Sequence, residues 1–390
     1  MLDNIEYNFD EEINRKNTNC AKYDGLKKYF GYEDLNPLWV ADMDFKTPSF
    51  INDAIINAAK NSLYGYSIDS DEIYQSIINW QNTQHSWQIN KEDVYMINGV
   101  VPAYSACIEA FSDEGDEVIV QTPIYPPLFK CVNANNRKVV INELKNDNGY
   151  YTMDLEDLES KITSKTKILA LCSPHNPVGR VWSKEELEKL ANICIKHNII
   201  IVSDEIHSDI TFKKFTPLAS ISKEIANQTI TLNSAGKTFN IAGLNSAYAI
   251  SKNQDILNKF KKIAQKREIQ SINFFGYVAT KAAYDNGALF VEELKKYLLS
   301  NIEFTKNYFK NNNSKIDFYT PEATYLLWLD FSKYNLSHNE IKNILLTKSK
   351  IALNDGVSFG NNGNGYFRLN IALSQNALEI ALSQLSKEFL

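Results

Sequence analysis

The chain has 390 residues, 44% of them hydrophobic, which is long enough for two domains that each bury a core. Its 47 acidic side chains outnumber its 41 basic ones, giving a net charge of −6. No stretch gathers enough lysine and arginine to neutralise a run of phosphates, so we expect no nucleic-acid partner.

The N-terminal residues and the apolar runs bear on where the protein works. Residues 1–12 are acidic and lack the basic start and apolar core of a secretory signal. The longest apolar runs, such as 325–329 and 199–202, are far shorter than the roughly 18 to 20 residues that span a bilayer. We therefore expect a cytoplasmic protein without a membrane partner. The five cysteines are scattered and never spaced as C-x-x-C, so we expect neither a disulfide framework nor a zinc site.

Regular secondary structure is predicted from about residue 47 onward. Thr47 and Pro48 predict a helix start, and a capping box at Ser183–Glu186 predicts a helix that runs to about His197. Short strands that are apolar on both faces alternate with helices, as in a parallel sheet covered on each side. The fold class is therefore α/β, with a mainly parallel sheet and helices on both faces. These strands are predicted at 118–121, 168–172, 199–203, 229–232 and 247–250.

The pattern changes after about residue 285. Long amphipathic helices are followed by strand-like segments at 324–330 and 366–372 and by a closing helix from Gln375, which indicates a smaller α+β domain. We therefore expect a large domain over 47–285 and a small domain over 286–390, with residues 1–46 packing on the small domain.

Chemically useful side chains follow four of the predicted strands. Tyr125 follows strand 118–121, Asn176 follows strand 168–172, Asp204 and His207 follow strand 199–203, and Ser234 and Lys237 follow strand 229–232. In open parallel sheets, ligands bind beyond the carboxyl ends of the strands, so these side chains are expected to meet at one edge.

Taken singly, these residues also have ordinary interpretations. Lys237 could be a surface lysine, Tyr125 could serve packing alone, and His207 could be a hydrogen-bonded core residue. Glu205 is interpreted as a cap for the following segment. Asp42 and Asp44 lack neighbouring histidines, so no metal is assigned.

Three sequence stretches together resemble a known family. Residues 39–45 (WVADMDF), 64–66 (YGY) and 203–207 (SDEIH) are similar to the fold-type I pyridoxal-phosphate enzymes of the aminotransferase class I/II group. Within that group they most resemble the cystathionine β-lyase and cysteine desulfhydrase branch of carbon-sulfur lyases. The resemblance covers nearly the whole chain and implies pyridoxal 5'-phosphate as cofactor.

The resemblance implies roles around the cofactor ring. Lys237 would carry the cofactor as a Schiff base and later take the substrate's Cα proton. Asp204 would keep the pyridine nitrogen protonated, Tyr125 would lie against the ring, and Asn176 would donate to the phenolic oxygen. His207 is assigned to the cofactor site as well.

The resemblance also implies how the phosphate and the substrate are held. Val100 and Val101 begin a helix that runs to about Phe111 and offer free N–H groups, while Ser234 adds a hydroxyl. Tyr64 would reach the phosphate of a neighbouring subunit, which implies a homodimer. Arg368 would bind the substrate carboxylate, with Tyr125 and Asn176 beside it.

Two positions depart from the aminotransferase pattern. Asn245 stands where many members have a phosphate-binding arginine, and His207 stands where many have a tyrosine. The second change favours a lyase that cleaves an L-cysteine thioether to a thiol, pyruvate and ammonia. An aminotransferase is the alternative, and a cofactor-binding regulatory protein is a third hypothesis.

Overall fold

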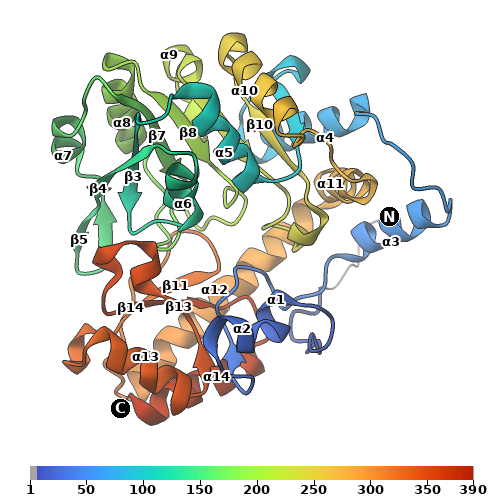
Figure 1. Ribbon diagram of the computed structural model, residues 1–390. Helices are drawn as coiled ribbons and strands as arrows, with labels where there is room; N and C mark the ends of the chain where they lie inside the picture. Colours follow the sequence, from blue (N-terminus) through green and yellow to red (C-terminus); the bar gives the residue numbers. More distant parts are fainter. Residues whose placement is uncertain (1–6, 390) are drawn as a thin grey trace.

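A computed structural model describes residues 7–389 and shows two regions, with a long helix extending from one into the other (Figure 1). The larger region holds the central sheet, and the smaller one lies below it with the C-terminal elements. The helix α12 (Ala288–Asn311) runs from one region into the other. The described residues contain no helix with the length and apolar character needed to cross a membrane.

The central sheet has seven strands in the order β2-β10-β9-β8-β7-β3-β4. All neighbouring pairs are parallel except those of β10, which runs antiparallel to both β2 and β9. The predicted α/β class with a mainly parallel sheet is thus confirmed. The strands are β2 (Val94–Ile97), β3 (Glu117–Thr122), β4 (Lys138–Glu143), β7 (Thr166–Cys172), β8 (Ile200–Asp204), β9 (Thr229–Asn233) and β10 (Ala247–Ile250).

Helices cover both faces of this sheet, as its two-sided apolar strands require. One face packs against α5 (Val100–Phe111), α6 (Pro127–Ala134) and α10 (Gln254–Lys266), and the other against α7 (Leu155–Ser160) and α8 (Lys184–Lys196). The predicted capping box is present, since the Ser183 hydroxyl accepts from the N–H of Glu186 at 3.1 Å. The remaining elements of this region are α3 (Ser49–Ala59), α4 (Asp71–His85), α9 (Lys223–Asn227), α11 (Phe274–Asn286) and the hairpin β5 (Lys145–Asp147) and β6 (Tyr150–Thr152).

The helix expected to have Thr47 as its N-cap and Pro48 as its first residue begins one residue later, at Ser49. Pro48 is in an extended conformation at the N-cap position of α3, and no side chain caps the helix there. Thr47 instead donates to the carbonyl of Asn240 at 3.5 Å.

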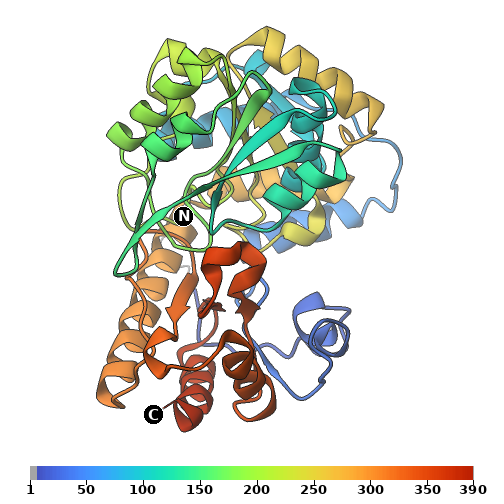
Figure 2. The same ribbon diagram turned by 60° about the vertical axis from the view of Figure 1, so that its left-hand side comes forward.

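The smaller region is built around a three-stranded antiparallel sheet in the order β11-β14-β13. The N-terminal segment lies beside it (Figure 2), where β1 (Asn36–Pro37) pairs with β12 (Ile351–Ala352). Residues 1–6 of the segment expected there lie outside the described residues. The other elements are α1 (Ala21–Asp24), α2 (Leu26–Phe30), β11 (Leu326–Asp330), α13 (His338–Thr347), β13 (Asn354–Asp355), β14 (Tyr366–Asn370) and α14 (Gln375–Glu388). Short 3₁₀ helices are η1 (Lys91–Asp93), η2 (Leu218–Ser220), η3 (Ala242–Leu244), η4 (Ser332–Tyr334), η5 (Gly356–Phe359) and η6 (Asn361–Gly363).

Candidate active site

A cavity of about 260 Å³ opens at the sheet edge where the predicted side chains meet. We call it the rim cavity. It borders eight of the ten predicted site residues, namely Val100, Val101, Tyr125, Asn176, Asp204, His207, Ser234 and Lys237. It is also lined by Ala41, Asn98, Gly99, Pro102, Cys172, Ile206, Gly236, Ala242, Asn245 and Ser246.

The strand directions explain this convergence. The parallel strands β3, β7, β8 and β9 all end at this edge, so the loops that follow them bring Tyr125, Asn176, Asp204 and Lys237 together. Because β10 runs the opposite way, its beginning lies at the same edge. Asn245 and Ser246 therefore join the cavity from before a strand.

The Lys237 ammonium sits at the centre of the site. Its Nζ donates to the carbonyl of Ala41 at 2.6 Å, and its side chain remains accessible from the cavity. No described carboxylate forms an ion pair with it. Loss of bulk water and the nearby Arg368 lower the Lys237 pKa to about 8, against the opposing pull of Asp42 and Asp204. A sizeable fraction of this amine is thus neutral near physiological pH.

Asp204 is a buried carboxylate without a cationic partner at bonding distance among the described residues. Within residues 7–389, the one hydrogen bond to its side chain comes from the backbone N–H of Ile206 at 3.2 Å. Burial raises the Asp204 pKa to about 6, although Ile206 and the charge of Lys237 oppose that shift. A positively charged group in the cavity would offset the free-energy cost of burying the negative charge of Asp204.

His207 and Tyr125 are held mainly by packing. The His207 ring packs edge-on against Tyr325, its Nδ1 finds no hydrogen-bond partner among the described residues, and burial lowers its pKa to about 3. His207 is therefore neutral at physiological pH. Burial raises the pKa of Tyr125, whose phenol consequently keeps its proton.

Arg368 is buried beside the rim cavity rather than on its lining. Its guanidinium donates to Asn176 Oδ1 and to the carbonyl of Trp39, each at 2.9 Å, and to Asn354. It forms no ion pair with any described carboxylate, and its Nε is unpartnered. The bond to Asn176 fixes which end of that amide is the acceptor, and it links β14 of the small region to the rim.

The N-terminus of α5 supplies the N–H groups expected at the far end of the cavity. Val100 is buried and Val101 is half-exposed, and both border the cavity. The nearby Asn98 has a buried side-chain oxygen without a partner in the described chain. The Ser234 hydroxyl accepts from the N–H of Gly236 at 2.9 Å and donates to the carbonyl of Ser246 at 2.6 Å, so in this structure its proton is already used.

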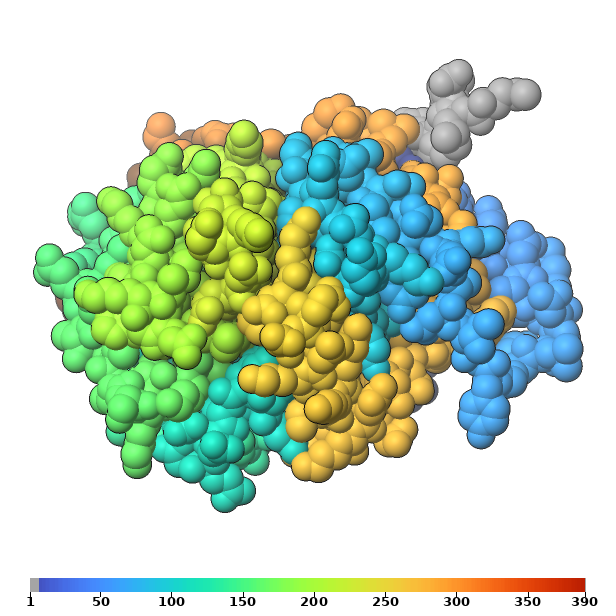
Figure 3. All heavy atoms as spheres, turned by 90° about the horizontal axis from the view of Figure 1, so that it is seen from above, coloured from blue at the N-terminus to red at the C-terminus, as the bar shows by residue number. Residues whose placement is uncertain are grey.

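Tyr64 does not reach the rim cavity of its own chain. The residue is 64% exposed, its ring packs on Phe275, and its hydroxyl donates to the carbonyl of Ala59 at 3.2 Å. The blue stretch around residues 60–70 extends away from the body of the molecule (Figure 3). Leu63, Tyr66 and Ile68 in this stretch are likewise exposed.

Comparison with known proteins agrees with this geometry. The sequence pattern described as "Aminotransferase class I and II" matches residues 39–385. The chain belongs to the aminotransferase class I and II family. The resemblance seen in the sequence is thereby confirmed, as is the fold class that it implied.

Three members of this family illustrate the range of likeness. Cystathionine beta-lyase PatB of Bacillus subtilis strain 168 is 37% identical over 97% of this chain and 98% of its own length. The structure of a PLP-bound putative aminotransferase from Clostridium difficile 630 is 44% identical, with a TM-score of 0.96 over 98% of this chain and 99% of that chain. Cystalysin from Treponema denticola, described with a pyridoxal 5'-phosphate cofactor, is 33% identical, with a TM-score of 0.95 over the same shares.

The residues of this family member fit pyridoxal phosphate. The unpartnered Asp204 carboxylate suits a protonated ring nitrogen, and the cavity-facing amine of Lys237 suits the aldehyde. The start of α5 marks a polar end of the cavity, where backbone N–H groups suit an anion. Asn245 lines this end without supplying a positive charge.

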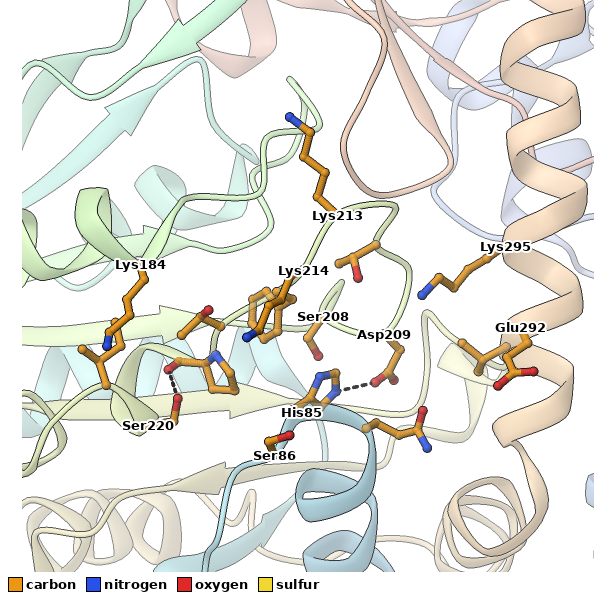
Figure 4. A pocket seen from close by; sticks show the side chains of 17 residues that line it. His85, Ser86, Lys184, Ser208, Asp209, Lys213, Lys214, Ser220, Glu292 and Lys295 are labelled. Carbon is orange, nitrogen blue, oxygen red and sulfur yellow. Dashed lines mark hydrogen bonds and ion pairs between the residues drawn. The ribbon is translucent and has the colours of Figure 1, made fainter.

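A second cavity, of about 490 Å³, is larger but differently built (Figure 4). We call it the lysine-lined cavity because Lys184, Lys213, Lys214 and Lys295 border it. Two of these already have partners, since Lys213 pairs with Glu322 at 2.5 Å and Lys184 with Glu188 at 3.5 Å. It contains none of the predicted site residues.

Asp209 forms part of the lining of the lysine-lined cavity and is fully paired. It accepts from His85 at 2.8 Å, Trp80 at 2.9 Å and Thr238 at 2.7 Å. These bonds lower its pKa despite its burial. Since Thr238 follows Lys237, the hydrogen bond from Thr238 to Asp209 helps to hold the backbone next to Lys237 in place.

Sequence reasoning missed several residues of the site. The carbonyl of Ala41 contacts Lys237, and the Tyr325 hydroxyl donates to the same oxygen at 3.1 Å. Ser246 was also missed, although it adjoins the noted Asn245. Asp42 and Asp44 do not form a metal centre: Arg15 pairs with both carboxylates, at 2.8 and 2.6 Å. The part of the chain that the structure describes shows no cluster of three or more metal-ligating side chains.

Proposed function

We propose that this protein is a pyridoxal-phosphate-dependent carbon-sulfur β-lyase that cleaves L-cystathionine or another L-cysteine S-conjugate to a thiol, pyruvate and ammonia. The observation that carries the proposal is a set of three charges without ion-pair partners among the described residues: the Lys237 amine and the Asp204 carboxylate, which line the rim cavity, and the Arg368 guanidinium beside it. These suit the aldehyde, the ring nitrogen and the substrate carboxylate, respectively. The similarity to a cystathionine β-lyase supports this reaction among those of the family.

Arg368 binds the substrate's carboxylate. Its charge has no partner within the described chain, while its bonds to Asn176 and Trp39 hold the planar guanidinium in place. A buried cation that is preorganised in this way loses little freedom when a carboxylate arrives. It therefore fixes the Cα–H bond of the substrate relative to Lys237.

Lys237 moves the proton at Cα. When bound, pyridoxal phosphate supplies an electron sink for the negative charge that develops there. The lowered pKa of Lys237, about 8, leaves enough neutral amine to act as a base at physiological pH. Tyr125 keeps its proton because burial raises its pKa, so Tyr125 and protonated Lys237 are the two groups that can donate to the departing sulfur.

The first test combines colour with product release. The purified protein with cofactor should absorb in the visible and release pyruvate and thiol together from L-cystathionine. Lys237→Ala should lose both the visible band and the products, whereas the exposed Lys252→Ala should retain both. A colourless wild-type protein at saturating cofactor would disprove the proposal.

Aminotransferase activity is the second candidate, favoured by the 44% identity to the putative aminotransferase structure. It uses the same proton abstraction but needs a keto acid as second substrate. Amino-group transfer that depends on added keto acid, without release of thiol, would replace the lyase assignment.

A homodimer completes the site. Tyr64 is exposed on a stretch that extends from the body, together with Leu63, Tyr66 and Ile68, and such apolar exposure favours a subunit contact. Tyr64 then reaches the phosphate in the partner's cavity. Mixing inactive Tyr64→Ala with inactive Lys237→Ala subunits should restore about a quarter of the wild-type activity, because hybrid dimers regain one intact site. No recovery after subunit exchange would place Tyr64 outside the active site.

A further inference from the structure

Residues 38–45 connect the two regions of the molecule beside the rim cavity. On the side of the small region, Asn370 Nδ2 donates to the carbonyls of Val40 and Asp42 at 2.6 Å each. On the other side, Asn240 exchanges hydrogen bonds with the backbone of Met43 at 2.8 and 3.0 Å. Asn240 lies three residues after Lys237. We call residues 38–45 the linking segment.

The inner side of the linking segment contacts the reactive amine. The Ala41 carbonyl accepts from Lys237 at 2.6 Å, and the Trp39 carbonyl accepts from Arg368 at 2.9 Å. The position of this backbone therefore sets where both cations lie.

The outer side of the linking segment is held by charges from the N-terminal residues. The Arg15 guanidinium binds both oxygens of Asp42, at 3.1 and 2.8 Å, and also Asp44 at 2.6 Å. Lys22, which is completely buried, donates to Asp44 at 2.7 Å. Lysine side chains are rarely fully buried unless they are paired, and here the partner, Asp44, belongs to the linking segment itself.

We propose that Arg15 and Lys22 are positioning residues that hold the Asp42 and Asp44 carboxylates away from Lys237 and so fix the Ala41 carbonyl against its amine. This inference rests on the proposed function for the role of Lys237, but the contacts themselves do not. Without Arg15, the Asp42 carboxylate would lose its fork-shaped partner and keep only Lys22, whose Nζ lies 3.7 Å away and already donates to Asp44. The negative charge of Asp42 would then act more strongly on Lys237 and keep its amine charged and unreactive.

The charged groups around Lys237 determine in which direction its pKa should move when one of them is changed. Asp204 faces it from β8, Arg368 from β14 and Asp42 from the linking segment. Neutral His207 and protonated Tyr125 complete the surroundings. Removing the cation that screens Asp42 should therefore raise the pKa of the Lys237 amine, and neutralising Asp42 should lower it.

The test uses the cofactor-free protein. Amide hydrogen exchange is measured over residues 38–45, and the pH midpoint of Lys237 acylation is measured by mass spectrometry. Arg15→Ala should speed exchange in the linking segment about tenfold through loss of its charge-assisted hydrogen bonds, and should move the midpoint upward. Asp42→Asn should move the midpoint downward, and Arg15→Lys should return it toward the wild-type value.

Lys16→Ala is the matched control, since Lys16 is exposed and adjacent to Arg15. It should change neither measurement. The proposal is overturned if Arg15→Ala leaves both measurements unchanged, if it speeds exchange equally across the whole chain, or if Arg15→Ala and Asp42→Asn shift the midpoint in the same direction. Neither measurement requires cofactor or turnover. Both can therefore be interpreted even if the proposed lyase reaction is wrong.

Discussion

The rim cavity and the lysine-lined cavity are lined by similar types of side chain, but they differ in how the charged side chains are paired. Both contain lysine, aspartate, histidine and serine side chains. The lysine-lined cavity is the larger of the two. In the part of the chain that the structure describes, its Asp209 has three hydrogen-bond donors, whereas Asp204 at the rim cavity has only the backbone N–H of Ile206. Unpaired buried charge, rather than volume, marks the site where a ligand completes the structure.

Lysine replacements test this comparison with the largest expected effect. Lys237→Ala should lower turnover of an L-cysteine thioether more than about 10³-fold, because both the cofactor link and the base are lost. Lys295→Ala, in the lysine-lined cavity, should leave turnover within about twofold, as it touches no group of the reaction. Steady-state release of pyruvate measures both. A large loss in Lys295→Ala would show that the second cavity also serves the reaction.

Aspartate replacements should have opposite effects on stability. Asp209→Asn breaks a buried charge network and should lower the free energy of unfolding of the cofactor-free protein by about 3 to 5 kcal/mol. Asp204→Asn removes a buried charge that has no partner, and should instead raise that free energy by roughly 1 to 3 kcal/mol. Urea unfolding gives both values. Equal losses in the two variants would mean that Asp204 is paired in solution.

The effect of Asp204→Asn on the free energy of unfolding should also depend on pH, which tests whether the Asp204 carboxylate is buried without a partner. Burial raises the folded-state pKa of Asp204 from 3.8 to about 6, so the folded protein binds this proton more tightly than the unfolded chain does. Protonated Asp204 therefore adds to the free energy of unfolding of the wild-type protein below pH 4, and this contribution is lost as the pH rises through 6. The stability difference between Asp204→Asn and wild type should therefore grow from about pH 4 to 6 and then stay constant. A difference that shrinks over this range would contradict the raised pKa.

Much of the rim cavity could be predicted because its residues follow strands. A strand that is apolar on both faces can be recognised locally, and the rule that parallel strands end at one edge then brings Asn176, Asp204 and Lys237 together. The strand β4 was missed because most of its side chains are exposed or only partly buried at the sheet edge, unlike those of the central strands. The strand β10 was found, but nothing in its four residues indicates that it runs antiparallel.

The contacts of the linking segment could not have been predicted from the sequence. The bond from Lys237 to Ala41 joins residues 196 positions apart and uses a backbone carbonyl, which every residue possesses. The pairing of Arg15 with Asp42 and Asp44 depends on how the N-terminal residues fold back. The WVADMDF stretch signalled a family, and it is the three-dimensional structure that relates its aspartates to the reactive amine.

The pairing of β1 with β12 has a consequence for how the chain is made. Asn36 and Pro37 pair with Ile351 and Ala352, and Asn36 also donates to Gln384, so the partners of this early segment are synthesised after the whole central sheet. The central sheet, whose strands lie between residues 94 and 250, has its own partners long before then. Residues 36 and 37 must therefore wait for these partners until the central sheet has been made, and the linking segment that follows them is fixed beside Lys237 only once Asn370 has been synthesised.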